Sequence, residues 1–230
     1  MTLAILLVGS YLLGAVPFGL IVGSLVAGVD VRSEGSGNIG ATNVFRVAGK
    51  PAGVAVMVLD VMKGLAPAHV AGVVGLGSQW QVAAGLAAIL GHMFSPFLRM
   101  KGGKGIATSL GVLLGVLPPV GITAFLLWCV VVLATGYVSL ASVLAAVSLP
   151  WLSVAAYPGD AIRLGFVSVA AALAIYRHRA NLCRLRDGTE SCFRRTRPRG
   201  LVVAIVVALA VLAVSLGARP LFGWLQLTHR

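Results

Sequence analysis

Long apolar runs separated by short polar stretches dominate the pattern of this sequence. Three such runs open the chain at residues 1–29, 52–76 and 80–98, and the only charged residues within them are Asp60 and Lys63. Runs of this length predict helices that cross a membrane, because a membrane-spanning helix needs about 20 apolar residues. A transmembrane strand barrel would instead alternate apolar and polar side chains along each strand.

The rest of the chain continues this pattern, since no charged residue lies between Lys104 and Asp160. We expect five further spans, at residues 105–117, 120–134, 138–156, 161–176 and 200–218. The first two are shorter than a full crossing requires. The pattern therefore predicts an all-α, polytopic helical membrane protein with a seven-span core, some short helices and an additional eighth C-terminal span. We assign residues 1–199 to the membrane core and residues 200–230 to the additional helix and tail.

Composition excludes the main alternatives to a membrane protein. Of the 230 residues, 59% are hydrophobic and only 10% are charged, whereas about 25% are charged in an ordinary soluble domain. A soluble globular enzyme of this length needs more polar surface than this chain offers. A disordered chain would be far less apolar.

The charge balance predicts how the helices are oriented. The chain has 18 Lys and Arg against 6 Asp and Glu, a net charge of +12. In a membrane protein this excess marks cytoplasmic loops and contact with anionic lipid, and we expect no nucleic-acid partner. With the N-terminus outside, 14 basic residues fall in cytoplasmic loops and three in external ones. The cytoplasmic motif loops are residues 30–51, 99–108, 135–142 and 177–199.

The first polar loop has the composition of a phosphate cradle, in the segment GSGNIGATNVFR at residues 35–46. Its glycines allow backbone N–H groups to approach an anion. Arg46 adds a planar, bidentate phosphate partner. The neutral polar side chains there are those of Ser36, Asn38, Thr42 and Asn43. A flexible loop between helices is the alternative interpretation of this segment, because it does not match the Walker A pattern.

The second loop, KGGKGIAT at residues 101–108, precedes a predicted helix. A helix N-terminus beside a lysine is an anion site. Lys101 and Lys104 are equally well explained as topology determinants. His92, one helix upstream, is either an acid or base or a buried packing residue.

The third loop, at residues 177–190, places His178 and Asn181 three residues apart, where they can share a helix face. Asp60 and Lys63 have the same spacing, and we favour an ion pair facing the bundle interior over a catalytic role for them. No GxSxG, HExxH or HxxxxD motif is present, nor a run of paired carboxylates for two metal ions. We therefore expect no metal and no cofactor, and a cationic, amide-rich site for phosphorylated substrates.

Taken together, the polar loops resemble the PlsY family of bacterial acyl-phosphate:glycerol-3-phosphate acyltransferases. The matching segments are SGNIGATNVFR at 36–46, GHMFSPFLRMKGGKGIAT at 91–108, HRANLCRLRDGTE at 178–190, YVSLAS at 137–142 and D-x-x-K-G at 60–64. The resemblance runs from Ser36 to Glu190. Cys192 stands where the third motif of the family usually has a lysine.

The resemblance implies an enzyme of phospholipid synthesis in the bacterial inner membrane. It would transfer a fatty acyl group from acyl phosphate to the 1-hydroxyl of sn-glycerol 3-phosphate, giving lysophosphatidate and phosphate. It also implies membrane lipid as a partner and a functional link to the enzyme that makes the acyl phosphate.

The resemblance also assigns roles to residues. Arg46, Lys104, His178 and Asn181 would be the catalytic residues, with the last two positioning glycerol 3-phosphate. The substrate and phosphate-binding residues would be Ser36, Gly37, Asn38, Gly40, Thr42, Asn43, Gly102, Gly103 and Ser142. The glycines Gly37, Gly40, Gly102 and Gly103 would allow close approach of the backbone.

Two other classes remain compatible with part of the pattern. A transporter of phosphorylated solutes would use a cationic cavity and the Asp60–Lys63 pair, but such proteins often carry repeats and midplane sites, and we find no repeat. A non-catalytic scaffold for lipid-synthesis enzymes would not need the SGNIGATN and KGGKG loops. Acyl transfer is therefore the leading hypothesis.

Overall fold

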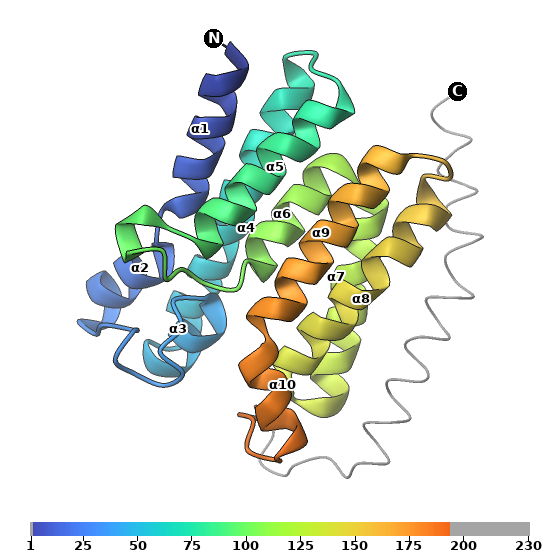
Figure 1. Cartoon of the computed structure of the whole chain (residues 1–230). Helices are drawn as coiled ribbons and strands as arrows, with labels where there is room; N and C mark the ends of the chain where they lie inside the picture. The colour runs from blue at the N-terminus through green and yellow to red at the C-terminus, as the bar shows by residue number, and fades with distance from the viewer. Residues whose placement is uncertain (1, 194–230) are drawn as a thin grey trace. The chain divides into compact units, whose positions relative to one another are not determined.

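The computed structural model of the chain describes residues 2–193, in which all regular elements are helices (Figure 1). The described residues contain five helical segments long and apolar enough to cross a membrane, or six if a bent pair counts as one span. One of the five, Leu3–Ala27, comprises two of these helices. The predicted all-α, polytopic membrane fold is thus confirmed. The described chain forms two compact units, one ending at Val116 and the other beginning at Leu117.

The first unit is built around one long helix. Its elements are α1 (Thr2–Ala15), α2 (Phe18–Ala27), α3 (Ala41–Val47), α4 (Lys50–Val73), α5 (Ser78–Met93), the 3-10 turn η1 (Pro96–Leu98) and α6 (Ile106–Val116). Helix α4 packs against α3, α5 and α6, and α1 packs against α5. Glycines permit the close approach of backbones: a side chain at Gly64 of α4 would collide with the Thr108 carbonyl of α6.

The second unit is a row of three long helices and a short one. These are α7 (Pro118–Thr135), α8 (Val138–Ala156), α9 (Ala161–Arg177) and α10 (Arg179–Arg186). Helix α8 packs against both α7 and α9. The Asp160 carboxylate caps α9 by accepting from the Arg163 N–H at 2.9 Å. The chain then bends by 55° between α9 and α10.

The structure refines several predicted spans. The first is two helices, α1 and α2, broken around Pro17, as expected where proline removes a helix hydrogen bond. The predicted short span at residues 120–134 is wrong: α7 has 18 residues, because its two prolines lie inside its first turn, where a missing N–H costs nothing. Helix α6 has only 11 residues, so a short apolar helix is confirmed there, and that it crosses the membrane stays a prediction.

The number of spans, seven plus an eighth, stays a prediction, as does the boundary between residues 199 and 200. The predicted last span, at residues 200–218, lies outside the described residues, and so do residues 194–199 of the last basic loop.

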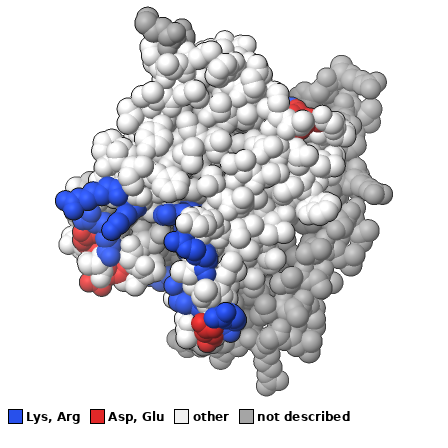
Figure 2. Space-filling view, in the orientation of Figure 1, with Lys and Arg blue, Asp and Glu red and all other residues white. Residues whose placement is uncertain are grey.

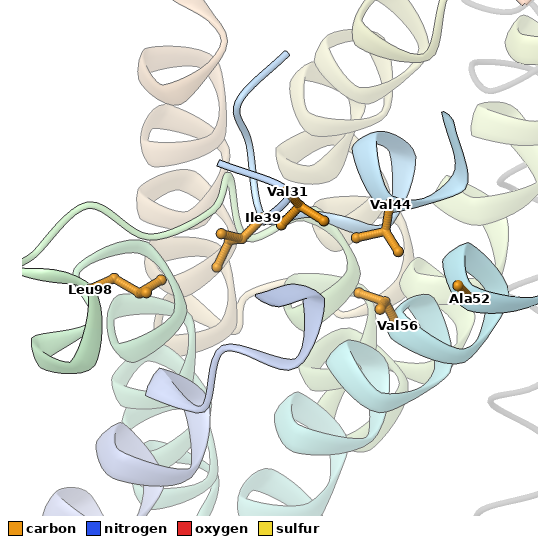
Figure 3. Close-up of a cluster of buried hydrophobic side chains, with 6 residues drawn as sticks. All are labelled: Val31, Ile39, Val44, Ala52, Val56 and Leu98. Atoms are coloured by element: carbon orange, nitrogen blue, oxygen red, sulfur yellow. The ribbon is translucent and has the colours of Figure 1, made fainter. Parts of the chain in front are cut away.

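A buried apolar cluster anchors the polar loops of the first unit. Figure 3 shows its six side chains, which come from the loop between α2 and α3, from α3, from α4 and from η1. They are Val31, Ile39, Val44, Ala52, Val56 and Leu98. Apolar side chains within a polar loop bury their surface in this way, which stabilises the loop by about 1.5–3 kcal/mol for each large side chain. The cluster therefore ties the loop at residues 30–40 to the segment that leads into the KGGKG loop.

Candidate functional site

Asn43 holds the first polar loop together from inside. Its side chain is 2% exposed. Its Oδ1 accepts from the Ser36 N–H at 2.8 Å, and its Nδ2 donates to the Val31 carbonyl at 2.8 Å and to the Glu34 carbonyl at 3.0 Å. The amide of Asn43 is thus occupied by the backbone of the loop. These bonds give Asn43 a role in shaping the loop, and its contact with phosphate stays a prediction.

Two glycines and Asn38 complete the shape of this loop. Gly37 has φ of +68°, a conformation that other residues rarely adopt, and a side chain on it would press on the Arg32 carbonyl. The Asn38 Oδ1 accepts from the Gly40 N–H at 2.8 Å, just before α3 begins. Thr42 lies in the first turn of α3 and is half-buried.

The exposed residues of the first loop include Ser36 and two arginines, Arg32 and Arg46. Ser36 and Arg46 are exposed, and Arg46 lies in the last turn of α3. The Arg32 guanidinium is paired with Asp30 at 2.6 Å, and its hydrogen bonds lower the pKa of Asp30 to about 2. Asp30 thus compensates the charge of Arg32, and Arg46, which is exposed, stays the predicted phosphate ligand of this loop.

The glycine pair of the second loop lies against the end of α5. The Gly102 N–H donates to the Met93 carbonyl and the Gly103 N–H donates to the His92 carbonyl, both at 3.1 Å. A side chain on Gly102 would collide with the His92 carbonyl, and one on Gly103 would collide with the His92 imidazole. These glycines therefore allow the backbone of the second loop to approach the end of α5, because their N–H groups donate to carbonyls of that helix.

Lys104 comes directly after this glycine pair and is half-buried. Gly105 follows with φ of +79° and leads into α6, which begins at Ile106. The position of Lys104 is thus set on one side by the contacts of the glycine pair with α5 and on the other by the start of α6.

The two loops of the first unit lie near each other, because Leu98 of η1 and Ile39 of the first loop share the apolar cluster of Figure 3. In Figure 2 the lysine and arginine side chains in view on this unit gather at the end where Figure 1 shows α3. From Gly64 to Leu98 the sequence contains no charged residue. One end of the first unit is therefore cationic, and its helical flanks are apolar.

In the second unit, His178 lies at the bend between α9 and α10 and is 2% exposed. Its Nδ1 is 2.8 Å from the Ala174 carbonyl. A carbonyl only accepts, so Nδ1 carries a hydrogen. We predicted that His178 and Asn181 share one helix face. In the structure His178 lies at the bend before α10, Asn181 lies within α10, and both are buried.

Glu190 holds Asn181 and Arg184 in place. The Asn181 Nδ2 donates to Oε1 at 2.6 Å, and the Arg184 Nε donates to Oε2 at 2.7 Å. Burial acts to raise the pKa of Glu190, but the hydrogen bonds from Asn181 and Arg184 outweigh it and lower that pKa below its usual range. The carboxylate is thus ionised at neutral pH. We did not expect this role from the sequence, since the partners lie six and nine residues away.

The turn between α7 and α8 is tied to the chain after α10. The Phe193 N–H donates to the Gly136 carbonyl at 3.0 Å. Cys192, which replaces the lysine usual in the resembling family, has its Sγ 3.6 Å from the Thr135 carbonyl. Ser142, one turn into α8, is buried, donates to the Val138 carbonyl at 2.8 Å and accepts from the Trp128 Nε1 at 3.2 Å.

Comparisons with known proteins point in one direction. A protein-family profile described as glycerol-3-phosphate acyltransferase matches residues 4–188. A relative of that name from Geotalea daltonii is 44% identical over 191 residues, covering 83% of this chain and 97% of the relative. One from Aquifex aeolicus is 46% identical over 190 residues, covering 82% and 97%.

Solved structures agree with the sequence comparisons. A crystal structure of PlsY, described as an integral membrane glycerol 3-phosphate acyltransferase in its glycerol 3-phosphate form, superposes with a TM-score of 0.79 at 45% identity. The match covers 84% of this chain and 96% of that one. A lysophosphatidic acid form has a TM-score of 0.76 at 43% identity, covering 89% and 100%.

Proposed function

The chain belongs to the glycerol-3-phosphate acyltransferase family, and we propose that it uses acyl phosphate as the donor and acylates the 1-hydroxyl of sn-glycerol 3-phosphate. The products are then lysophosphatidate and inorganic phosphate. The membrane fold and the family together support an acyltransferase of phospholipid biosynthesis. The identity of the donor is the part of this proposal that an assay must decide.

The proposed step requires little chemical activation by the protein. An acyl phosphate is a mixed anhydride, so its carbonyl already carries a good leaving group. The 1-hydroxyl oxygen bonds to the carbonyl carbon, the bond from that carbon to the phosphate oxygen breaks, and the hydroxyl proton passes to the leaving phosphate. That transfer is feasible because a phosphate group has a second pKa of about 6, so the leaving phosphate can accept a proton near neutral pH. The protein then contributes positioning and charge stabilisation.

In this proposal, cations of the first unit hold the phosphates. Arg46 is exposed on α3 beside the exposed Ser36 loop, and Lys104 precedes α6. A guanidinium and an ammonium both bind phosphate through charge-assisted hydrogen bonds. The loop-shaping residues Asn38, Asn43 and the glycines act by keeping these cations in place.

Glycerol 3-phosphate is assigned to the second unit. We assign His178 to the positioning of glycerol 3-phosphate, and its Nδ1 contact with the Ala174 carbonyl fixes the orientation of the ring. Asn181 is oriented by Glu190. Ser142 uses its hydrogen for Val138, so in this proposal it contributes an oxygen lone pair or acts on the shape of α8.

One observation carries the proposal: the loops at one end of the first unit are cationic and rich in glycine, and the helices beside them are apolar. A substrate with a phosphate head and a fatty chain matches both surfaces. We place these loops on the cytoplasmic side of the bacterial inner membrane by the positive-inside rule. An acyl phosphate hydrolyses readily, so an enzyme that makes it is the expected functional partner.

The test uses purified full-length protein in detergent or lipid cubic phase. Palmitoyl phosphate and glycerol 3-phosphate are mixed with the protein, phosphate release is followed, and lysophosphatidate is identified by mass spectrometry. Palmitoyl-CoA replaces the acyl phosphate as the control donor. We expect turnover only with acyl phosphate, and turnover with palmitoyl-CoA alone would overturn the proposed donor.

Two substitutions test the proposed phosphate contacts. Arg46→Ala and Lys104→Ala should each abolish most activity, since one charge-assisted hydrogen bond contributes about 1.5–3 kcal/mol. Lys50→Ala is the matched control, because Lys50 is an exposed cation at the start of α4 outside the proposed contacts. Near-normal rates for both Arg46→Ala and Lys104→Ala would show that these roles are assigned wrongly.

A further inference from the structure

Three ionisable side chains are buried inside the first unit and have no part in the reaction proposed above. Lys63 and Asp60 of α4 form an ion pair of 2.7 Å, with side chains 1% and 2% exposed. The Lys63 Nζ also donates to the Val16 carbonyl at 2.9 Å. His92 of α5 is 4% exposed, and its Nδ1 is 3.7 Å from the Asp60 Oδ1. This distance is longer than a hydrogen bond, but it places the ring against the carboxylate.

His92 is the point where this buried group meets the second loop. Its carbonyl accepts from the Gly103 N–H at 3.1 Å. Its Nε2 lies so close to Gly103 that a Cβ there would collide with the ring. One side of the imidazole therefore faces Asp60, and the other supports the residue immediately before Lys104. The ring thus fills the space that a side chain on Gly103 would occupy.

Stability alone is a weak reason for these charges. Removing two ions from water costs several kcal/mol each, and an apolar pair of similar volume is often as stable or more so. Charged residues within membrane helices are rare and usually functional. Any function must be exerted through a neighbour, since Asp60 and Lys63 are almost completely buried. The neighbour that reaches the candidate site is His92.

We propose that Lys63, Asp60 and His92 are positioning residues for the segment from Gly102 to Lys104. Lys63 is fixed by the Val16 carbonyl and holds the Asp60 carboxylate. Asp60 orients the His92 imidazole, and His92 holds the glycine pair through its ring and its backbone carbonyl. The inference rests on the proposed function in one respect, namely that Lys104 binds a substrate phosphate.

The experiment uses a double variant that removes both charges together. Asp60→Leu with Lys63→Met replaces the ion pair by apolar side chains, so that neither charge is left buried alone. His92→Ala removes the ring. His69→Ala is the matched control, because His69 is an exposed histidine of α4, the helix that carries Asp60 and Lys63. For each protein we would measure the melting temperature, kcat, KM for each substrate, and amide hydrogen exchange of residues 99–105.

We expect the double variant and His92→Ala to raise KM for a phosphorylated substrate about tenfold, because a displaced binding group weakens contact with its ligand. Their kcat values should change less, and the Gly102 and Gly103 amides should exchange faster. His69→Ala should match the wild type in every measurement.

The outcomes separate this inference from the proposed function. Wild-type protein without turnover would refute the proposed function, and hydrogen exchange would still test the positioning network. A folded double variant with wild-type KM and wild-type exchange would show that the pair is only structural. If the double variant does not fold, His92→Ala decides, and unchanged exchange at residues 99–105 would overturn the inference.

Discussion

Substituting Asn43 tests whether the first loop depends on a single buried amide. Asn43→Ala removes hydrogen bonds to Ser36, Val31 and Glu34, of 2.8, 2.8 and 3.0 Å. A buried hydrogen bond contributes about 1 kcal/mol net, so the ordered loop loses about 3 kcal/mol. At 1.36 kcal/mol for each factor of ten, kcat/KM should fall by up to about 100-fold.

Asn43→Asp separates the hydrogen bonds from the volume of the side chain. A carboxylate can still accept from the Ser36 N–H, but it cannot donate to the Val31 and Glu34 carbonyls. It also places a negative charge beside two carbonyl oxygens. We therefore expect Asn43→Asp to be at least as inactive as Asn43→Ala, although it is the closer match in shape.

The assay is phosphate release from acyl phosphate in the presence of glycerol 3-phosphate, together with the melting temperature of each variant. Ser33→Ala is the control within the same loop, because Ser33 makes one exposed hydrogen bond, to the Asp30 carbonyl at 2.9 Å. It should remain close to the wild type. If Asn43→Ala retains kcat/KM within about twofold, the loop does not depend on this amide and the reasoning fails.

Three further predictions concern other parts of the structure. Glu190→Gln should raise KM for glycerol 3-phosphate about tenfold, because Asn181 and Arg184 lose their shared carboxylate. Because the pKa of Glu190 is lowered from 4.5, its contribution to stability should be fully present above pH 4.5 and lost at lower pH. Melting temperatures measured against pH would show this loss in the wild type, and an equal loss in Glu190→Gln would contradict it. Gly103→Ala should lose most activity by displacing the His92 ring, whereas Gly9→Ala, with open space around it, should not. Ser95→Ala should lower the stability by about 1 kcal/mol, because its buried hydroxyl donates to the Ala15 carbonyl at 2.7 Å, and an unchanged melting temperature would refute this.

The helices were predictable because their cause is local. A chain in lipid must satisfy its backbone hydrogen bonds within each segment, so a long apolar run is enough to predict a helix. Errors appeared where this rule is incomplete. The double proline was expected to lie before the helix at residues 120–134, but α7 begins at Pro118 and includes both prolines in its first turn.

The candidate residues were predictable as types but not as roles. Glycines and asparagines in a polar loop indicate an anion site, and Arg46 and Lys104 remain the proposed phosphate ligands. The structure assigns different partners to several others. The amide of Asn43 is occupied by loop backbone, and Gly102 and Gly103 donate to carbonyls of α5. Each partner lies several residues away, so no local pattern identifies it.

By itself, the sequence determined the class of protein, the membrane helices and the loops that carry the chemistry, because composition and hydrophobic runs act over one segment at a time. Tertiary structure decided which polar groups are occupied. The contact of Asp60 with His92 and of His92 with Gly103 depends on the packing of α4, α5 and the second loop. Helix packing brings together groups that are distant in the chain, and burial then requires each polar group to find a partner.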